Sequence, residues 1–175
     1  MMVTGWDNDG GKEWYYLDAV AETFEEGRGK QKLGWVNDGG YDWYYYDKEE
    51  GELAINWELI DGKWYFFSDD ANNIATYGQM KRGWQLIDGA WYYFDTDENN
   101  KGEMIVGWKK IDGIWYYFDE NRENNDDDYG KMVTGWHLIY NVWYYFYTKE
   151  PYDGDLAVST VIDGYQLDGE GRIIA

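Results

Sequence analysis

Tryptophan is the residue whose abundance and spacing could support chemistry in this chain. The sequence has 12 Trp, 19 Tyr and 6 Phe in 175 residues. The Trp residues form six pairs whose members lie seven or eight positions apart: Trp6 and Trp14, Trp35 and Trp43, Trp57 and Trp64, Trp84 and Trp91, Trp108 and Trp115, and Trp136 and Trp143. An indole ring attracts cations to its π face, and aromatic rings also stack on sugar rings. The pairs therefore indicate a repeated aromatic binding surface.

Charge and composition argue against several other functions. With 15 Lys and Arg against 35 Asp and Glu, the net charge is −20, whereas nucleic-acid binding needs a basic surface. No apolar run approaches the ~20 residues that span a bilayer. The chain has no Cys for disulfides or thiolate–metal sites. It opens with MMVTGW, which is not a signal peptide. If the protein is exported, we expect its signal to lie on a segment outside this sequence.

No catalytic constellation stands out among the polar residues. The sequence lacks a Gly-rich phosphate loop and has a single His, so it has no His cluster for a metal. Asp95, Asp97 and Asn99 alternate as in a calcium loop, but the Gly at position six and the Glu at position twelve are missing. We therefore expect no enzyme, no metal and no cofactor.

An internal repeat organises nearly the whole chain. Its units read approximately G-x-M-x-x-G-W-x-x-x-D-G-x-W-Y-Y-F-D, and residues 78–95 and 102–119 are the cleanest copies. Repeats of this length are typical of solenoid proteins. We expect a single repeat domain over residues 1–175, with six full units at about 2–18, 29–47, 51–68, 78–95, 102–119 and 130–147 and a degenerate closing unit at 154–173.

Each repeat carries the signal of a β-hairpin. Asp-Gly between two β-prone runs favours a type I′ turn, whose two central residues need positive φ. With residues 88–89 as the turn, Trp84 faces Tyr93 and Leu86 faces Trp91 across the strands. Because side chains alternate between faces with period two, Trp84 and Trp91 lie diagonally on one face. An isolated hairpin is only marginally stable in water, so we predict an all-β solenoid of stacked hairpins.

The motifs around the Trp pairs resemble those of a known family. GW followed by WYYF or WYYL, with Gly-x-Met leading into the next GW, is similar to the choline-binding repeats, which are the cell-wall-binding repeats of Gram-positive surface proteins and of phage and bacterial lysins. The resemblance extends from Met2 to near Arg172. It implies a left-handed stack of hairpins with ligand sites between successive units. Each site would be a cage of two Trp from one hairpin, one Tyr from the next, and often a Met.

Transferred residue by residue, the resemblance implies five cages. They are Trp84, Trp91, Tyr116 and Met104; Trp108, Trp115, Tyr144 and Met132; Trp57, Trp64, Tyr92 and Met80; Trp35, Trp43, Tyr65 and Leu53; and Trp6, Trp14 and Tyr44, with Gln31 in place of a Met.

The sequence also departs from the repeat pattern at several positions. Trp136 and Trp143 should lack a complete cage, because the closing unit offers only a displaced Tyr165. Asn56 replaces a repeat Gly, and Tyr140-Asn141 replaces the Asp-Gly turn. The turn inside each of the first two Trp pairs is also longer than in the other pairs. These longer turns could keep the first two pairs from lying diagonally.

The implied ligand is the choline of teichoic or lipoteichoic acid, or its phosphocholine form. A quaternary ammonium has no N–H to donate, so its charge and methyl groups suit aromatic faces. The implied role is a non-catalytic module that anchors a parent protein at the bacterial surface, which makes it extracellular and cell-wall associated. The exposed end hairpins could pair into a homodimer. Two alternatives remain open: a carbohydrate-binding repeat domain for glucan or host glycans, and a structural spacer or protein-interaction rod.

Overall fold

A computed structural model describes most of the chain. The described residues are 5–8, 14–17, 33–37, 43–49, 51–73, 75–97, 102–121, 128–149 and 153–174. The chain divides into two compact units, Met1–Lys81 and Arg82–Ala175. The single repeat domain expected over the whole chain stays a prediction.

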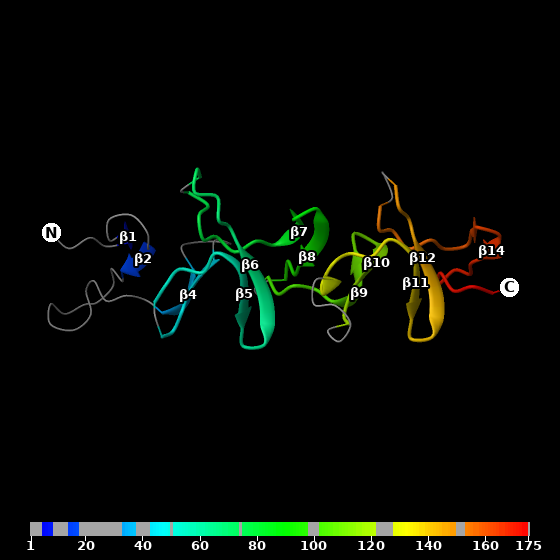
Figure 1. Ribbon diagram of the computed structural model, residues 1–175, viewed down its shortest axis with the longest axis horizontal. Helices are drawn as coiled ribbons and strands as arrows, with labels where there is room; N and C mark the ends of the chain where they lie inside the picture. Colours follow the sequence, from blue (N-terminus) through cyan, green and yellow to red (C-terminus); the bar gives the residue numbers. More distant parts are fainter. Residues whose placement is uncertain are drawn as a thin grey trace. The chain divides into compact units, whose positions relative to one another are not determined.

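Both units consist of consecutive antiparallel hairpins, each a two-stranded sheet of its own (Figure 1). The described ranges contain no α-helix, so the all-β prediction is confirmed. Within those ranges, no helical segment has the length and apolarity to cross a bilayer. The first unit pairs β1 (Gly5–Asn8) with β2 (Trp14–Leu17), β3 (Gly34–Asn37) with β4 (Trp43–Tyr46), and β5 (Asn56–Ile60) with β6 (Lys63–Phe67). The second pairs β7 (Gly83–Ile87) with β8 (Ala90–Phe94), β9 (Gly107–Ile111) with β10 (Ile114–Phe118), β11 (Gly135–Ile139) with β12 (Val142–Phe146), and β13 (Val161–Ile162) with β14 (Tyr165–Gln166).

The strand register agrees with the one expected from the Asp-Gly turns. In β7–β8, Trp84 pairs with Tyr93 and Leu86 pairs with Trp91. The turn residues 88 and 89 have φ of 49° and 79°, as a type I′ turn requires. The longer connection between β3 and β4 leaves the ladder unchanged, because Trp35 still pairs with Tyr45. The Trp pair of this hairpin therefore stays diagonal.

Two sequence departures keep the backbone conformation of the residues that they replace. Tyr140 and Asn141 have φ of 48° and 65°, so they form the same kind of turn as Asp-Gly. Asn56 has φ of 60°, whereas Gly83 and Gly107, which precede the first Trp of their pairs, have φ of 69° and 73°. Asn tolerates the left-handed region better than most residues with a Cβ atom. The fold therefore survives at these positions without the preferred residues.

In the second unit, the segment that follows a hairpin ties that hairpin to the one before it. Met132 forms an isolated β-bridge with Phe118 at the end of β10. Its backbone N–H also donates to the carbonyl of Trp91 in the preceding hairpin, at 2.8 Å. The same two contacts join Leu156 to Phe146 and to Trp115, the second at 3.0 Å. This backbone bonding stacks successive hairpins within a unit.

The core consists of small clusters between successive hairpins rather than one large interior. At its centre lie aromatic residues at strand ends, all with 0% exposure: Tyr46, Phe67, Phe94, Phe118 and Phe146. In the first unit, Phe67 packs with Tyr45, Tyr65 and Met80, and Trp35 and Trp43 cover this cluster. The aromatic residues therefore provide the burial that Leu, Ile and Val provide in most domains.

Candidate functional site

The two Trp of a pair stand at right angles on one face of their hairpin. The ring planes of Trp84 and Trp91 meet at 87°, with centroids 6.2 Å apart. For Trp108 and Trp115 the values are 90° and 6.3 Å. Two further pairs have the same arrangement: Trp57 with Trp64 at 88° and 6.4 Å, and Trp35 with Trp43 at 80° and 6.4 Å. Each pair thus forms two perpendicular walls.

A tyrosine of the next hairpin supplies a third ring. The centroids of Trp84 and Tyr116 lie 4.9 Å apart, and so do those of Trp108 and Tyr144. Trp35 and Tyr65 repeat this distance in the first unit. The structure therefore brings together the three rings expected for the Trp84, Trp108 and Trp35 sets. The Trp57, Trp64 and Tyr92 set is divided between the two compact units and stays a prediction. The Trp6, Trp14, Tyr44 and Gln31 set stays a prediction, because the side chains of Trp6, Trp14 and Gln31 lie outside the described part of the chain.

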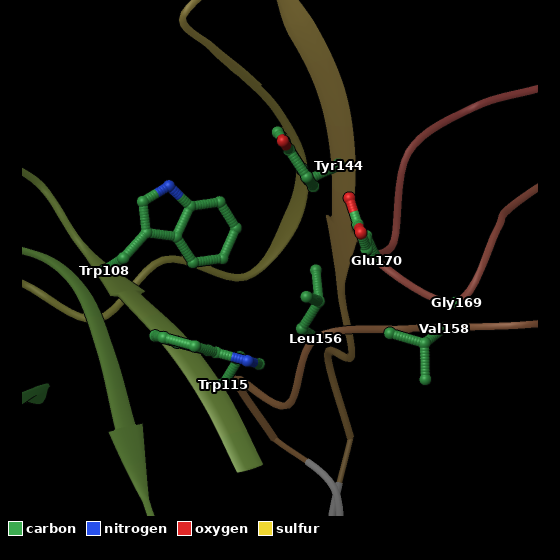
Figure 2. Close-up of a pocket in the computed structure, with 7 residues that line it drawn as sticks. All are labelled: Trp108, Trp115, Tyr144, Leu156, Val158, Gly169 and Glu170. Carbon is green, nitrogen blue, oxygen red and sulfur yellow. The ribbon is translucent and has the colours of Figure 1, made fainter.

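One of these ring sets lines an open cavity of about 420 Å³, a size typical of small-molecule sites (Figure 2). Figure 2 shows Trp108 and Trp115 on one side and Tyr144 on another, with Leu156 between the strands that carry them. The full lining is Trp108, Trp115, Tyr144, Leu156, Val158, Gly169 and Glu170. Four of these residues were not among the expected site residues, and all four come from segments that follow β12.

The apolar fourth member of each ring set differs from the one expected. Leu156, not Met132, lines the cavity beside Trp108. Met132 belongs one set earlier, because its N–H binds the Trp91 carbonyl and its side chain packs on the same cluster as Trp84 and Tyr116. Met80 likewise donates its N–H to Trp43, at 2.8 Å, in the set for which Leu53 was expected.

This displacement has a simple structural cause. The Gly-x-Met segment follows one hairpin and then crosses back over the hairpin that precedes it. The Met side chain therefore contributes to the earlier of the two sites. Leu53 lies against the position of Gly78 instead, and Met104 lies against that of Gly130. The structure thus places Met132 and Met80 one ring set earlier than expected, and Leu156 could have been found from its alignment with Met in the segment Gly154–Leu156. The sequence gives no comparable signal for Glu170.

The last Trp pair lies beside the shortened closing hairpin. Trp136 and Tyr165 have centroids 5.7 Å apart, compared with 4.9 Å in the preceding sets. The indole N–H of Trp136 donates to Asp163 Oδ2 at 2.9 Å, and Trp143 is 47% exposed. Tyr165 therefore contacts Trp136, but with a wider spacing and with a carboxylate at the edge of the indole ring.

Two of the expected cage tyrosines, Tyr116 and Tyr92, have raised pKa values. Burial, together with a hydrogen bond to Asp155, raises the pKa of Tyr116 far above the ordinary value. Burial also raises the pKa of Tyr92, although nearby Lys131 opposes the shift. At neutral pH these rings carry no charge, so each presents an ordinary π face to a ligand.

The loop that resembles a calcium site has a structural role. The carboxylate of Asp95 accepts the N–H of Asp97 at 2.9 Å and pairs with the Lys109 ammonium at 3.1 Å. Across the residues that the structure describes, no three acidic, His or Cys side chains gather as a metal site would need. Asp95 therefore stabilises the connection between β8 and β9.

Comparison with known proteins identifies the family. The profile described as a choline-binding repeat matches residues 55–106, 81–125 and 105–160. The chain belongs to the choline-binding repeat family. A second profile, described as a putative cell wall binding repeat, matches residues 4–19. No curated protein matched the chain.

Solved structures of choline-binding proteins have the same fold. Choline-binding protein F from Streptococcus pneumoniae, crystallised with a peptidoglycan analogue, is 33% identical over 99% of this chain and 47% of its own, with a TM-score of 0.76. The modular Cpl-1 endolysin is 27% identical over 96% of this chain and 40% of its own, with a TM-score of 0.50. The autolysin LytC from Streptococcus pneumoniae is 22% identical over 98% of this chain and 37% of its own, with a TM-score of 0.57. At this identity, the comparison shows a shared fold alone. This choline-binding repeat chain spans less than half the length of each of these proteins.

Proposed function

We propose that this chain is a non-catalytic module that binds the choline of teichoic or lipoteichoic acid and thereby holds a parent protein at the bacterial surface. One observation carries the proposal: the rings of Trp108, Trp115 and Tyr144 line a single cavity. Family membership supports choline as the ligand. The surface location and the anchoring role follow from the same ligand.

The cavity suits a trimethylammonium group. The perpendicular indoles of Trp108 and Trp115 offer two π faces, Tyr144 offers a third, and the methyl groups of Leu156 complete an apolar contact. Each cation–π contact contributes ~0.5–2 kcal/mol. Because association costs offset much of this gain, we expect a weak site with a dissociation constant of about 1 mM. Such a site is weak alone, and several on one chain would hold a choline-bearing polymer through high effective concentration.

Choline titration monitored by Trp fluorescence tests the proposal. We expect a saturable response at millimolar choline, with no response to glucose oligomers or to matched potassium chloride. Trp115→Ala should remove part of the response. Ile114→Ala is the matched control, because Ile114 is the neighbouring residue, is 40% exposed and does not line the cavity.

Other outcomes would point to the alternative functions. A response to glucose oligomers without one to choline would overturn the proposal in favour of carbohydrate binding. Silence toward both ligands would leave a structural or protein-interaction role for the Trp pairs.

A further inference from the structure

The cavity beside Trp108 has one wall that the repeat pattern does not supply. Gly169 and Glu170 come from the turn that follows β14 in the closing segment. Figure 2 shows Glu170 beside Tyr144, across the cavity from Trp108 and Trp115. Among the lining residues in the described part of the chain, Glu170 is the one with a formal charge. The closing segment thus adds a carboxylate to an otherwise aromatic and aliphatic site.

The turn that carries Glu170 is held by the carboxylate of Asp168. Asp168 Oδ1 accepts the backbone N–H of Glu170 at 2.8 Å and that of Arg172 at 2.9 Å. The Asp168 carbonyl accepts the N–H of Gly171 at 3.1 Å. These bonds fix the backbone on both sides of Glu170, so its side chain leaves the turn in a defined direction.

The charges around the turn do not cancel. Arg172 Nη2 lies 2.8 Å from Asp168 Oδ2 and 3.0 Å from Glu170 Oε2. One guanidinium therefore faces two carboxylates, which leaves a net negative charge at the rim of the cavity. The Glu170 side chain is 72% exposed, so water and salt weaken its field without removing it.

We propose that Glu170 is a specificity-determining residue that makes the Trp108–Trp115–Tyr144 cavity prefer a cation over a neutral ligand of the same shape. The inference rests on the proposed function, since it concerns the same cavity. The aromatic walls accept a trimethylammonium group and its uncharged carbon analogue equally well by shape. The carboxylate attracts only the cation. Arg172 limits this effect by neutralising part of the negative charge.

A site-resolved titration can test this role. The protein is labelled with 5-fluorotryptophan, and the ¹⁹F signal of Trp115 is assigned with Trp115→Phe. Choline and its neutral analogue 3,3-dimethylbutan-1-ol are titrated into the wild type and three variants at low salt. Glu170→Gln removes the carboxylate, Arg172→Gln removes its partner, and Glu49→Gln changes the net charge equally from an exposed position on another hairpin.

The three variants have different expected effects. Glu170→Gln should weaken choline binding at Trp115 about two- to fivefold, the range of exposed charge interactions. Arg172→Gln should strengthen it, and Glu49→Gln should leave it unchanged. Binding of 3,3-dimethylbutan-1-ol should be the same in all four proteins. In 1 M potassium chloride, the difference between wild type and Glu170→Gln should shrink, because salt screens the carboxylate.

Several results would overturn the inference. Equal weakening by Glu170→Gln and Glu49→Gln would show that only the overall charge matters, and an unchanged choline affinity in Glu170→Gln would show that the carboxylate does not act. Equal loss of both ligands in Glu170→Gln would show a structural role. A wild-type Trp115 signal that does not respond to choline would instead overturn the proposed function itself, and the inference with it. Near-ultraviolet circular dichroism of each variant verifies that the aromatic stack is intact.

Discussion

At the residue scale, the two tryptophans of a pair serve different purposes. Trp84 is half-buried and touches Tyr116 and Phe118, with centroids 4.9 and 5.7 Å away. Trp91 is 36% exposed and forms the outer wall. The first Trp is therefore both core and binding surface, whereas the second contributes mainly to the binding surface. One residue type supports stability and recognition without a separate core.

Alanine substitutions should separate these two purposes. Trp84→Ala should lower the free energy of unfolding by about 3 kcal/mol, the low end of the cost of removing a buried aromatic, because Trp84 is half-buried. Trp91→Ala should lower it by about 1 kcal/mol. Both changes should abolish choline binding at their own site. Urea unfolding together with choline titration measures the difference, and equal losses of stability would contradict the division of roles.

Tyr116 gives a pH-dependent prediction. Burial, and then the hydrogen bond to Asp155, raise its pKa above the ordinary value. The neutral phenol is thus favoured in the folded state, and the stability from this group is fully present below about pH 10. It is lost as the pH rises through the folded pKa. Asp155→Asn should move the pKa of Tyr116 down toward the ordinary value.

Nuclear magnetic resonance of ¹³Cζ-labelled tyrosine, assigned with Tyr116→Phe, follows this titration directly. Asp153→Asn is the control, since it removes a neighbouring carboxylate while leaving Asp155 in place. An unchanged Tyr116 titration in Asp155→Asn would show that burial alone holds the phenol neutral.

At the scale of elements, the hairpin was the most predictable feature. An Asp-Gly turn, a Trp on each strand and period-two alternation were enough to give the register of β7–β8, because all of these signals are local. Contacts between hairpins were harder to infer. The family resemblance set Tyr116 beside Trp84, and the structure has these rings in contact. It set Met132 with Trp108, whereas the structure packs Met132 on the cluster of Trp84 and Tyr116. The Met132 N–H bonds to Trp91, and that pairing depends on how the connecting segment crosses back.

Glycines show how closely the elements approach one another. Gly62 and Gly78 have φ of 80° and 73°. A Cβ atom at Gly62 would meet open space, whereas one at Gly78 would lie 2.5 Å from Leu53 Cδ2 and 2.8 Å from Leu53 Cγ. Gly62→Ala should cost about 1 kcal/mol of unfolding free energy from backbone strain. Gly78→Ala should cost roughly 1–3 kcal/mol more, because the clash adds overpacking.

Urea unfolding midpoints of the two glycine variants test this comparison. The loss of unfolding free energy caused by Gly78→Ala should be smaller in a Leu53→Ala background than in the wild type, because the shorter side chain makes room for the new methyl group. Equal destabilisation by Gly62→Ala and Gly78→Ala would show that backbone strain is the whole effect.

At the scale of the whole molecule, recognition depends on the number of sites. Surface plasmon resonance should show slow dissociation from a dense choline surface and fast dissociation from a sparse one. Replacing Trp91 and Trp115 together by Ala should accelerate dissociation from the dense surface about tenfold or more. The Ile114→Ala variant should behave like the wild type. Equal dissociation rates on dense and sparse surfaces would indicate a single working site.

The hydrogen bond from the Met132 N–H to the Trp91 carbonyl has a consequence for grafting such a site into another protein. A cage of this kind draws on residues from Trp84 to Met132, so the smallest stretch that could carry it into another scaffold extends well beyond one sequence repeat. A single grafted repeat would carry two indole rings, but it would lack the third ring and the apolar side chain that completes the site. The same dependence applies to duplication of repeats. A new repeat gains a complete pocket only when a further repeat follows it. In this chain, the number of complete pockets is therefore expected to be smaller than the number of repeats.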